Sequence, residues 1–174
     1  MGRLMKNIVA KTIGDNRISQ EAVTYNEWDD NIRLNELLIK VSKAVGSLYV
    51  NDEYILDVDC TFLHTSCVNA NKQPKDNKQG FNPMICLIGN LPVFISMRNG
   101  NSSADFRQKE CIEQCLNLLK KEGIKVKVVR TDGAGYREPL TKMINDRGIK
   151  FLTASPVNAS YKTMFRQFAI SDWR

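Results

Sequence analysis

The order of the apolar patterns along the chain is the feature that most constrains its fold. Three strand-like segments come first, at residues 54–64, 82–88 and 92–97. Two helical patterns then alternate with two further strand-like segments, at 102–121, 125–130, 136–147 and 149–153. The Gly89–Asn90 pair between the second and third strands is typical of a hairpin. Three meandering antiparallel strands followed by alternating helices and strands predict an α/β fold with a mixed sheet covered by helices.

The region before these segments predicts a single helix. Residues 1–30 are polar and aperiodic, and we expect them to be loose or partly ordered. From Asn31 onward, apolar side chains recur at helical spacing up to a stop at Gly46, and we expect them to form the packed face: Leu34, Leu37, Leu38, Val41 and Val45. We therefore divide the chain into an N-terminal region (1–50), a core (51–155) and a tail (156–174).

The helix expected after residue 101 carries its own start and stop signals. Ser102 with Asp105 three residues later resembles a capping box, and Gly123 follows two lysines as a C-terminal stop. Its apolar stripe contains Ile112, Cys115, Leu116 and Leu119. We expect this stripe to face the sheet.

Carboxylates at strand positions are the strongest candidates for chemistry. Asp59 lies inside an apolar strand, and Asp57 shares its face by the period of two. Asp132 ends another strand and precedes the Gly133–Gly135 loop, the kind of place where open α/β sheets hold their sites. If the two strands are neighbours, Asp59 and Asp132 repel each other unless a divalent cation such as Mg²⁺ or Mn²⁺ lies between them. A hydrogen bond from a loop, or a lysine partner, is an alternative explanation for a strand aspartate.

Two other sites are suggested by short patterns, and both are weakly supported. The Gly-Ala-Gly of residues 133–135 hints at a nucleotide loop but lacks a third glycine and a phosphate-binding lysine. Cys60, His64 and Cys67 could suggest zinc, yet no fourth ligand follows at a suitable spacing. We expect neither a nucleotide cofactor nor zinc.

Charge and cysteine content indicate the partner and the compartment. Lys and Arg outnumber Asp and Glu by 25 to 19, which gives a net charge of +6 and favours a polyanion, although many basic proteins bind none. The five cysteines are odd in number and lack paired spacing, which favours a reducing compartment. Neither a signal peptide nor a membrane-spanning run is recognisable, so we expect no membrane partner and a cytoplasmic location.

Four short motifs together resemble one protein family. They are Leu-Asp-Val-Asp-Cys-Thr at 56–61, Gly-Phe-Asn-Pro at 80–83, Arg-Asn-Gly-Asn-Ser at 98–102 and Arg-Thr-Asp-Gly-Ala-Gly-Tyr at 130–136. In this order and spacing they resemble the insertion-sequence transposases of the DDE class, in the branch with an Asp-x-Asp-x-Thr first motif. The resemblance covers roughly residues 50 to 155, and the joint order is far more specific than any one motif.

The resemblance implies a ribonuclease H-like catalytic domain with a two-ion site. It assigns Asp59 and Asp132 as catalytic carboxylates and ligands of two Mg²⁺ or Mn²⁺ ions, with Asp57 and Thr61 in support. Asp57 is the alternative first carboxylate if the register of the motif differs. The family's third acid is a glutamate on a downstream helix, which neither Glu138 nor Asp172 matches. We therefore expect the fold to be incomplete at the C-terminal end of this chain.

The function implied by the resemblance is DNA cleavage and strand transfer during transposition of an insertion sequence. Its partners would be the transposon ends and the target, both double-stranded DNA, and a homo-oligomer on DNA is compatible with this activity. The basic candidates for DNA contact are Lys72, Lys75, Lys78, Arg98 and Arg130, for which a solvated polar surface is an equally good explanation. The alternative function is a catalytically inactive remnant with at most weak DNA binding.

Overall fold

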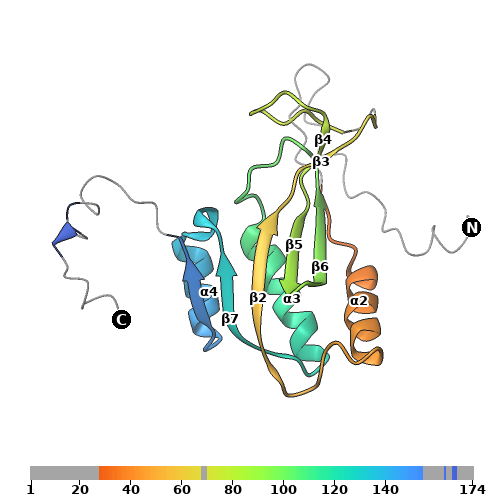
Figure 1. Ribbon diagram of the computed structural model, residues 1–174, viewed down its shortest axis with the longest axis vertical. Coiled ribbons are helices and arrows are strands. Elements are labelled where there is room, and N and C mark those ends of the chain that lie inside the picture. Colours follow the sequence, from red (N-terminus) through yellow and green to blue (C-terminus); the bar gives the residue numbers. More distant parts are fainter. Residues whose placement is uncertain (1–27, 68–69, 155–162, 164–165, 168–174) are drawn as a thin grey trace, which may run out of the picture.

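The computed structural model describes residues 28–67, 70–154, 163, 166 and 167. A mixed six-stranded sheet carries three helices, and a small two-stranded hairpin rises from one end of it (Figure 1). The elements in chain order are β1 (Trp28–Asp29), α2 (Ile32–Ala44), β2 (Glu53–Cys60), β3 (Leu63–His64), β4 (Gly80–Phe81), β5 (Met84–Ile88), β6 (Leu91–Arg98), α3 (Gln108–Lys121), β7 (Lys125–Thr131), the 3-10 helix η1 (Gly133–Gly135), α4 (Glu138–Asp146) and β8 (Lys150–Thr153).

The sheet has the order β1-β6-β5-β2-β7-β8. β2, β5 and β6 form an antiparallel meander, whereas β7 and β8 run parallel to β2. The α/β mixed sheet predicted from the sequence is therefore confirmed. Its topology is compatible with the ribonuclease H-like fold that the resemblance implies.

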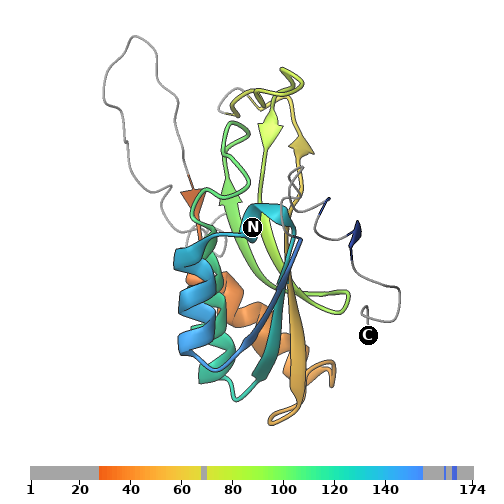
Figure 2. The same cartoon turned by 90° about the vertical axis from the view of Figure 1, so that its left-hand side faces the viewer.

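The core lies between the sheet and the helices α3 and α4, which cover one of its faces (Figure 2). Leu56 of β2, Met84 of β5 and Leu119 of α3 are all fully buried there. Burying each such side chain stabilises the fold by about 1.5–3 kcal/mol. The whole predicted stripe of α3 is buried, as expected.

Three of the five cysteines belong to this core. Cys86, Cys111 and Cys115 are buried between β5 and α3, and no disulfide joins any cysteines that the structure describes. The hydrogen bond with Cys86 and the burial of the thiol both raise the pKa of Cys111, which keeps it protonated. These cysteines pack as small hydrophobic side chains.

The start of α3 differs from the prediction. The helix begins at Gln108, after Arg107 in a left-handed conformation with φ 55°, and no side chain caps it. The expected Ser102–Asp105 capping box was wrong, because these residues belong to a loop that the neighbouring elements hold. Asn82 Nδ2 donates to the carbonyl of Ser102 at 2.9 Å, and Arg98 Nη1 donates to that of Phe106 at 2.7 Å.

The packed face of α2 was also predicted wrongly. Asn35, Ile39 and Ser42 are buried against β6, while most of the expected apolar stripe is exposed, namely Leu34, Leu37, Val41 and Val45. The side-chain amide of Asn35 explains this orientation. It donates to the Ile95 carbonyl at 3.0 Å and accepts from the Ile95 N–H at 2.9 Å, so it satisfies backbone groups at the edge of β6. The hydrogen bonds of Asn35 with β6 therefore determine which face of α2 is buried, rather than the spacing of its apolar residues.

The strand β1 was not predicted, because it lies in the segment that was expected to be loose. Trp28 and Asp29 pair with Arg98 and Met97 at the outer edge of β6. The buried carboxylate of Asp30 then accepts a hydrogen bond from Arg107 Nη2 at 2.8 Å. The expectations for residues 1–27 and for most of the tail concern parts of the chain outside the described residues.

The face of the sheet opposite α3 and α4 remains open to solvent. It carries three apolar side chains that are 38–57% exposed, Ile55, Met97 and Leu152. No described helix covers this face (Figure 2). Within the described ranges, no helix has the length and apolar character needed to cross a membrane.

Candidate carboxylate site at the ends of β2 and β7

The register of β2 and β7 places Asp59 beside Asp132. These parallel strands pair Asp57 with Arg130 and Val58 with Thr131, and the next residues are Asp59 of β2 and Asp132, which directly follows β7 in an extended conformation. Both aspartates share the open face of the sheet with Asp57, because side chains alternate along a strand. Burial raises the pKa of the neighbouring Cys60 thiol, and the charges of Asp59 and Asp132 raise it further. The positive charge of Arg98 and its hydrogen bond partly offset this rise in the pKa of Cys60.

Each of these aspartates is exposed and keeps one carboxylate oxygen unused. Asp59 Oδ1 accepts from the N–H of Cys60 at 2.7 Å, and Asp132 Oδ1 accepts from the N–H of Ala134 at 3.1 Å. Neither Oδ2 atom has a hydrogen-bond partner among the described residues. The Asp132 carbonyl accepts from the Thr153 hydroxyl at 2.6 Å, which ties the loop after β7 to β8. The backbone is thus fixed while two hard oxygen atoms face solvent.

Asp57, expected as a supporting residue, is occupied by an ion pair. Arg130 donates from Nε and Nη2 to the two carboxylate oxygens of Asp57, at 2.5 and 2.7 Å. This bidentate hydrogen bond raises the pKa of Arg130. Asp57 therefore orients Arg130 beside the aspartate pair, and both of its carboxylate oxygens already accept a hydrogen bond. Thr61, the other supporting residue, has an exposed side chain, and its N–H donates to the Pro83 carbonyl at 3.1 Å.

Arg98 does not lie where a DNA contact requires it. Only 1% of its surface is exposed, which corrects the expectation that it reaches DNA phosphates. Its Nε donates to the Asn82 carbonyl at 3.0 Å, and its Nη2 lies 2.9 Å from Cys60 Sγ. The guanidinium thus joins β2, β6 and the loop before α3 behind the aspartate pair. Arg130, by contrast, remains about half exposed.

The Gly-Ala-Gly segment after Asp132 is explained by packing. A Cβ atom added to Gly135 would lie 2.0 Å from Thr131 Oγ1, so only glycine fits under the 3-10 turn. The same atom added to Gly133 would meet nothing closer than 3.5 Å. The turn aims Asp132, and the structure gives no reason to assign these glycines to a nucleotide.

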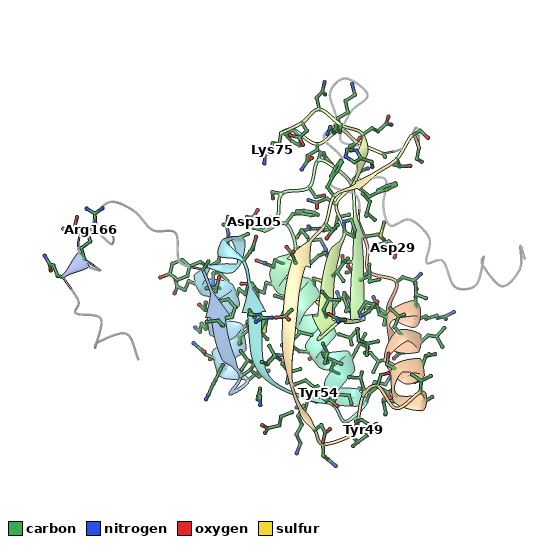
Figure 3. All side chains as sticks on the ribbon, viewed as in Figure 1. Asp29, Tyr49, Tyr54, Lys75, Asp105 and Arg166 are labelled. Atoms are coloured by element: carbon green, nitrogen blue, oxygen red, sulfur yellow. The ribbon has the colours of Figure 1, made fainter. Side chains whose placement is uncertain are left out.

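The Gly80 and Gly100 motifs pack loops together at the same end of the sheet. A Cβ on Gly100 would lie 2.4 Å from the carbonyl oxygens of Asn71 and Gly80. Asn99 Oδ1 also accepts from the N–H of Asn71. These contacts hold the loop that carries the predicted DNA-contacting lysines Lys72, Lys75 and Lys78, all exposed, with Lys75 beyond the end of the sheet (Figure 3).

One acidic residue near the site was overlooked as a functional candidate. Asp105 lies at the same end of the molecule (Figure 3) and pairs with Arg137 Nη2 at 2.6 Å. A hydrogen bond from Ser103, together with the charges of Arg137 and Arg98, lowers the pKa of Asp105. In the sequence, Asp105 stands three residues after Ser102, and this spacing led to its prediction as part of a helix cap.

A third metal ligand is not found in the part of the chain that the structure describes. No three His, Cys, Asp or Glu side chains there are arranged to hold a metal, and this includes Cys60, His64 and Cys67. Glu138 is the exposed first residue of α4. Asp172 lies outside the described residues.

Comparisons with known proteins add little to this geometry. No family model and no curated protein matches the chain. Among solved structures, a chain of the simian T-cell lymphotropic virus intasome in complex with the PP2A regulatory subunit B56 gamma is similar, with 12% identity and a TM-score of 0.39. The match covers 69% of this chain but only 38% of that chain, and a likeness this distant carries no argument about function.

Proposed function

We propose that this chain contains the metal-dependent catalytic core of a DNA transposase that cuts and joins DNA strands. The single observation that carries the proposal is the register of β2 and β7. It brings the aspartates of two separate motifs to adjacent positions on one open face. Residues 59 and 132 are far apart in the chain, and the motif order that suggested the family does not by itself require their adjacency.

The donor set fits a hard divalent cation. Mg²⁺ and Mn²⁺ prefer carboxylate oxygens and keep several waters, so an exposed pair with free oxygens suits them. Asp59 and Asp132 would hold the ion through their unused Oδ2 atoms. A cation bound there would polarise a phosphodiester and help a water or a DNA hydroxyl to attack phosphorus.

The chain's own residues would orient the DNA around that position. Arg130 presents a partly exposed guanidinium held by Asp57, one step along the strands from the aspartate pair. The loop with Lys72, Lys75 and Lys78 projects from the same end of the sheet. Lysine contacts with phosphates position DNA without reading its sequence. The proposed substrate is therefore double-stranded DNA, with transposon ends as the specific sites.

Nicking of supercoiled plasmid DNA tests this function. Once a third acid is supplied to the site, the chain with Mg²⁺ or Mn²⁺ should convert supercoiled plasmid to the open circle, and EDTA should stop the conversion. Asp132→Asn keeps the shape of the side chain but removes its charge, so it should abolish nicking. Glu110→Gln is the matched control, because Glu110 is exposed on α3, away from the open face of the sheet, and forms no side-chain hydrogen bond or ion pair with the described residues. It should nick like the wild type.

The inactive-remnant alternative predicts a different result, and the described residues give it one specific support. They bring two acids together rather than three. If the chain never nicks DNA with either metal even after a third acid is supplied, although it binds Mn²⁺ and is folded, the remnant is the better description. Nicking that Asp132→Asn leaves unchanged would exclude the proposed active site.

A further inference from the structure

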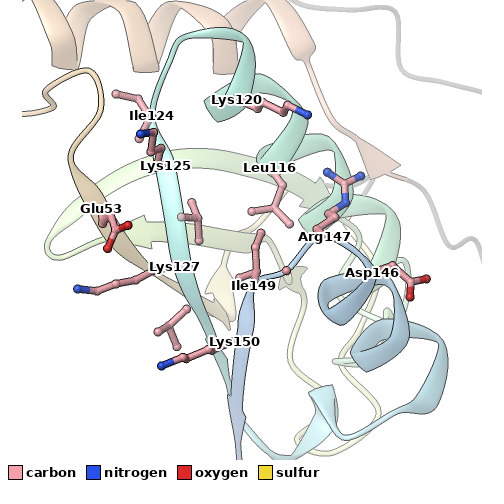
Figure 4. Close-up of a pocket in the computed structure, with 13 residues that line it drawn as sticks. Glu53, Leu116, Lys120, Ile124, Lys125, Lys127, Asp146, Arg147, Ile149 and Lys150 are labelled. Carbon is pink, nitrogen blue, oxygen red and sulfur yellow. The ribbon is translucent and has the colours of Figure 1, made fainter.

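A basic groove lies at the end of the sheet opposite the aspartate pair. β7 and β8 pair only from Val128 and Lys150 onward, so the first residues of β7 diverge from the chain between α4 and β8. The space between them forms a groove of about 990 Å³ (Figure 4). Its volume is at the upper end of the range for ligand sites in proteins.

Four lysines around this groove have no partner in the described part of the chain. Lys120 comes from α3, Lys125 and Lys127 from β7, and Lys150 from β8, and none forms a side-chain hydrogen bond or ion pair. Arg147 also lines the groove but is bound to Glu113 at 3.0 Å. Two acids, Glu53 and Asp146, are the counter-charges in the lining. The groove therefore carries a net positive charge that nothing described neutralises.

The backbone contributes to this arrangement. The pairing of β2 with β7 shifts register between Tyr54 and Ile55, which makes Lys127 the extra residue of a bulge. Bulges re-aim side chains and are common next to functional sites. Lys127 and Lys150 extend to the same side of β7, with Leu116 and Ile149 on the other side (Figure 4). The groove thus combines cations at its rim with an apolar wall.

We propose that this groove binds the phosphate backbone of a nucleic acid, as a second site separate from the aspartate pair. Unpaired lysines from three elements suit an extended polyanion better than a single small anion, and phosphate contacts release counterions from DNA. The groove is lined by the β7 residues 125–128, so four to seven residues, or roughly 13 to 23 Å, separate its lining from Asp132. DNA bound there would be a segment other than the one at Asp59 and Asp132.

Fluorescence anisotropy with a labelled DNA duplex tests the proposal. The triple variant Lys125→Gln, Lys127→Gln and Lys150→Gln should weaken binding at least tenfold at low salt. It should also reduce the slope of log affinity against log salt by about 0.9 per lost contact. The matched control neutralises three exposed lysines elsewhere, Lys40, Lys109 and Lys142, and should change the affinity less than threefold.

The remaining measurements separate this site from the proposed active site and from other ligands. Asp59→Asn with Asp132→Asn should leave groove binding intact, even if nicking fails for every variant. Equal weakening by the two triple variants, or no weakening by the groove variant, would overturn the proposal. So would loss of tripolyphosphate or acidic-peptide binding in the groove variant while duplex affinity stays unchanged, because the occupant would then not be a nucleic acid.

Discussion

The two ends of the parallel strands are built in opposite ways. At the end with Asp59 and Asp132, a buried arginine and close-fitting glycines fix the loops, and two acids face solvent. At the other end, four lysines line a groove with no partner among the described residues. The comparison predicts that altering the buried polar contacts at the aspartate end lowers stability, whereas altering the exposed lysines at the other end changes stability little.

Removing the Arg98 guanidinium should have the largest effect on stability. Arg98→Met leaves the partly buried carbonyls of Asn82 and Phe106 without the donors that Arg98 supplies, and each such loss costs about 1–3 kcal/mol. We expect the free energy of unfolding, measured with urea, to fall by about 3 kcal/mol or more. Arg130→Met, the exposed control, should lower it far less, because solvent screens an exposed ion pair. Similar values for the two variants would mean that the aspartate end has no buried framework.

Filling the space under the 3-10 turn should have an intermediate effect. Gly135→Ala places a methyl group against the Thr131 hydroxyl, and overpacking of this kind costs about 1–3 kcal/mol. It should also weaken Mn²⁺ binding, because the turn positions Asp132. Gly133→Ala, where the space is open, should leave the unfolding midpoint and the metal affinity near wild type. A harmless Gly135→Ala would show that the turn is looser than described.

Acid pH should lower the stability of the aspartate end of the sheet, because it protonates Asp105. Its pKa is lowered in the folded protein, so its contribution to stability is present above its unfolded pKa of about 4 and is lost as the pH falls through the folded value. Asp105→Asn should lower the thermal midpoint modestly at pH 7 and hardly at all near pH 2. A difference between variant and wild type that stays constant with pH would contradict the assigned interaction with Ser103 and Arg137.

Neutralising the groove lysines should have the smallest effect on stability. Lys125→Gln, Lys127→Gln and Lys150→Gln remove no described contact and relieve mutual repulsion. We expect unfolding free energies within about 0.5 kcal/mol of wild type at moderate salt. A larger loss would show that these lysines hold the fold together, as the polar framework does at the other end.

The sequence predicted the sheet and the acid pair because both follow from local patterns. Alternating apolar residues define β2 and β7, and the placement of Asp59 and Asp132 follows once these strands are parallel neighbours. Long-range polar contacts escaped prediction. The hydrogen bond from the Asn35 amide to β6 orients α2 so that its apolar residues face outward. Arg98 binds the loop that was expected to form the first turn of α3.

The groove also escaped prediction, because it depends on where β8 stops pairing with β7. Alternating lysines in β7 look like an ordinary solvated strand edge in the sequence. Only the divergence of the chain after α4 turns them into the rim of a concave site.

Titration with Mn²⁺, followed by the electron paramagnetic resonance signal of the free ion, tests the central claim most directly. We expect the wild-type chain and Glu110→Gln to bind Mn²⁺ with the same affinity. Asp59→Asn and Asp132→Asn should each weaken binding at least tenfold while circular dichroism shows an unchanged fold. Wild-type affinity in both of these variants would contradict the claim that the ends of β2 and β7 form a metal site.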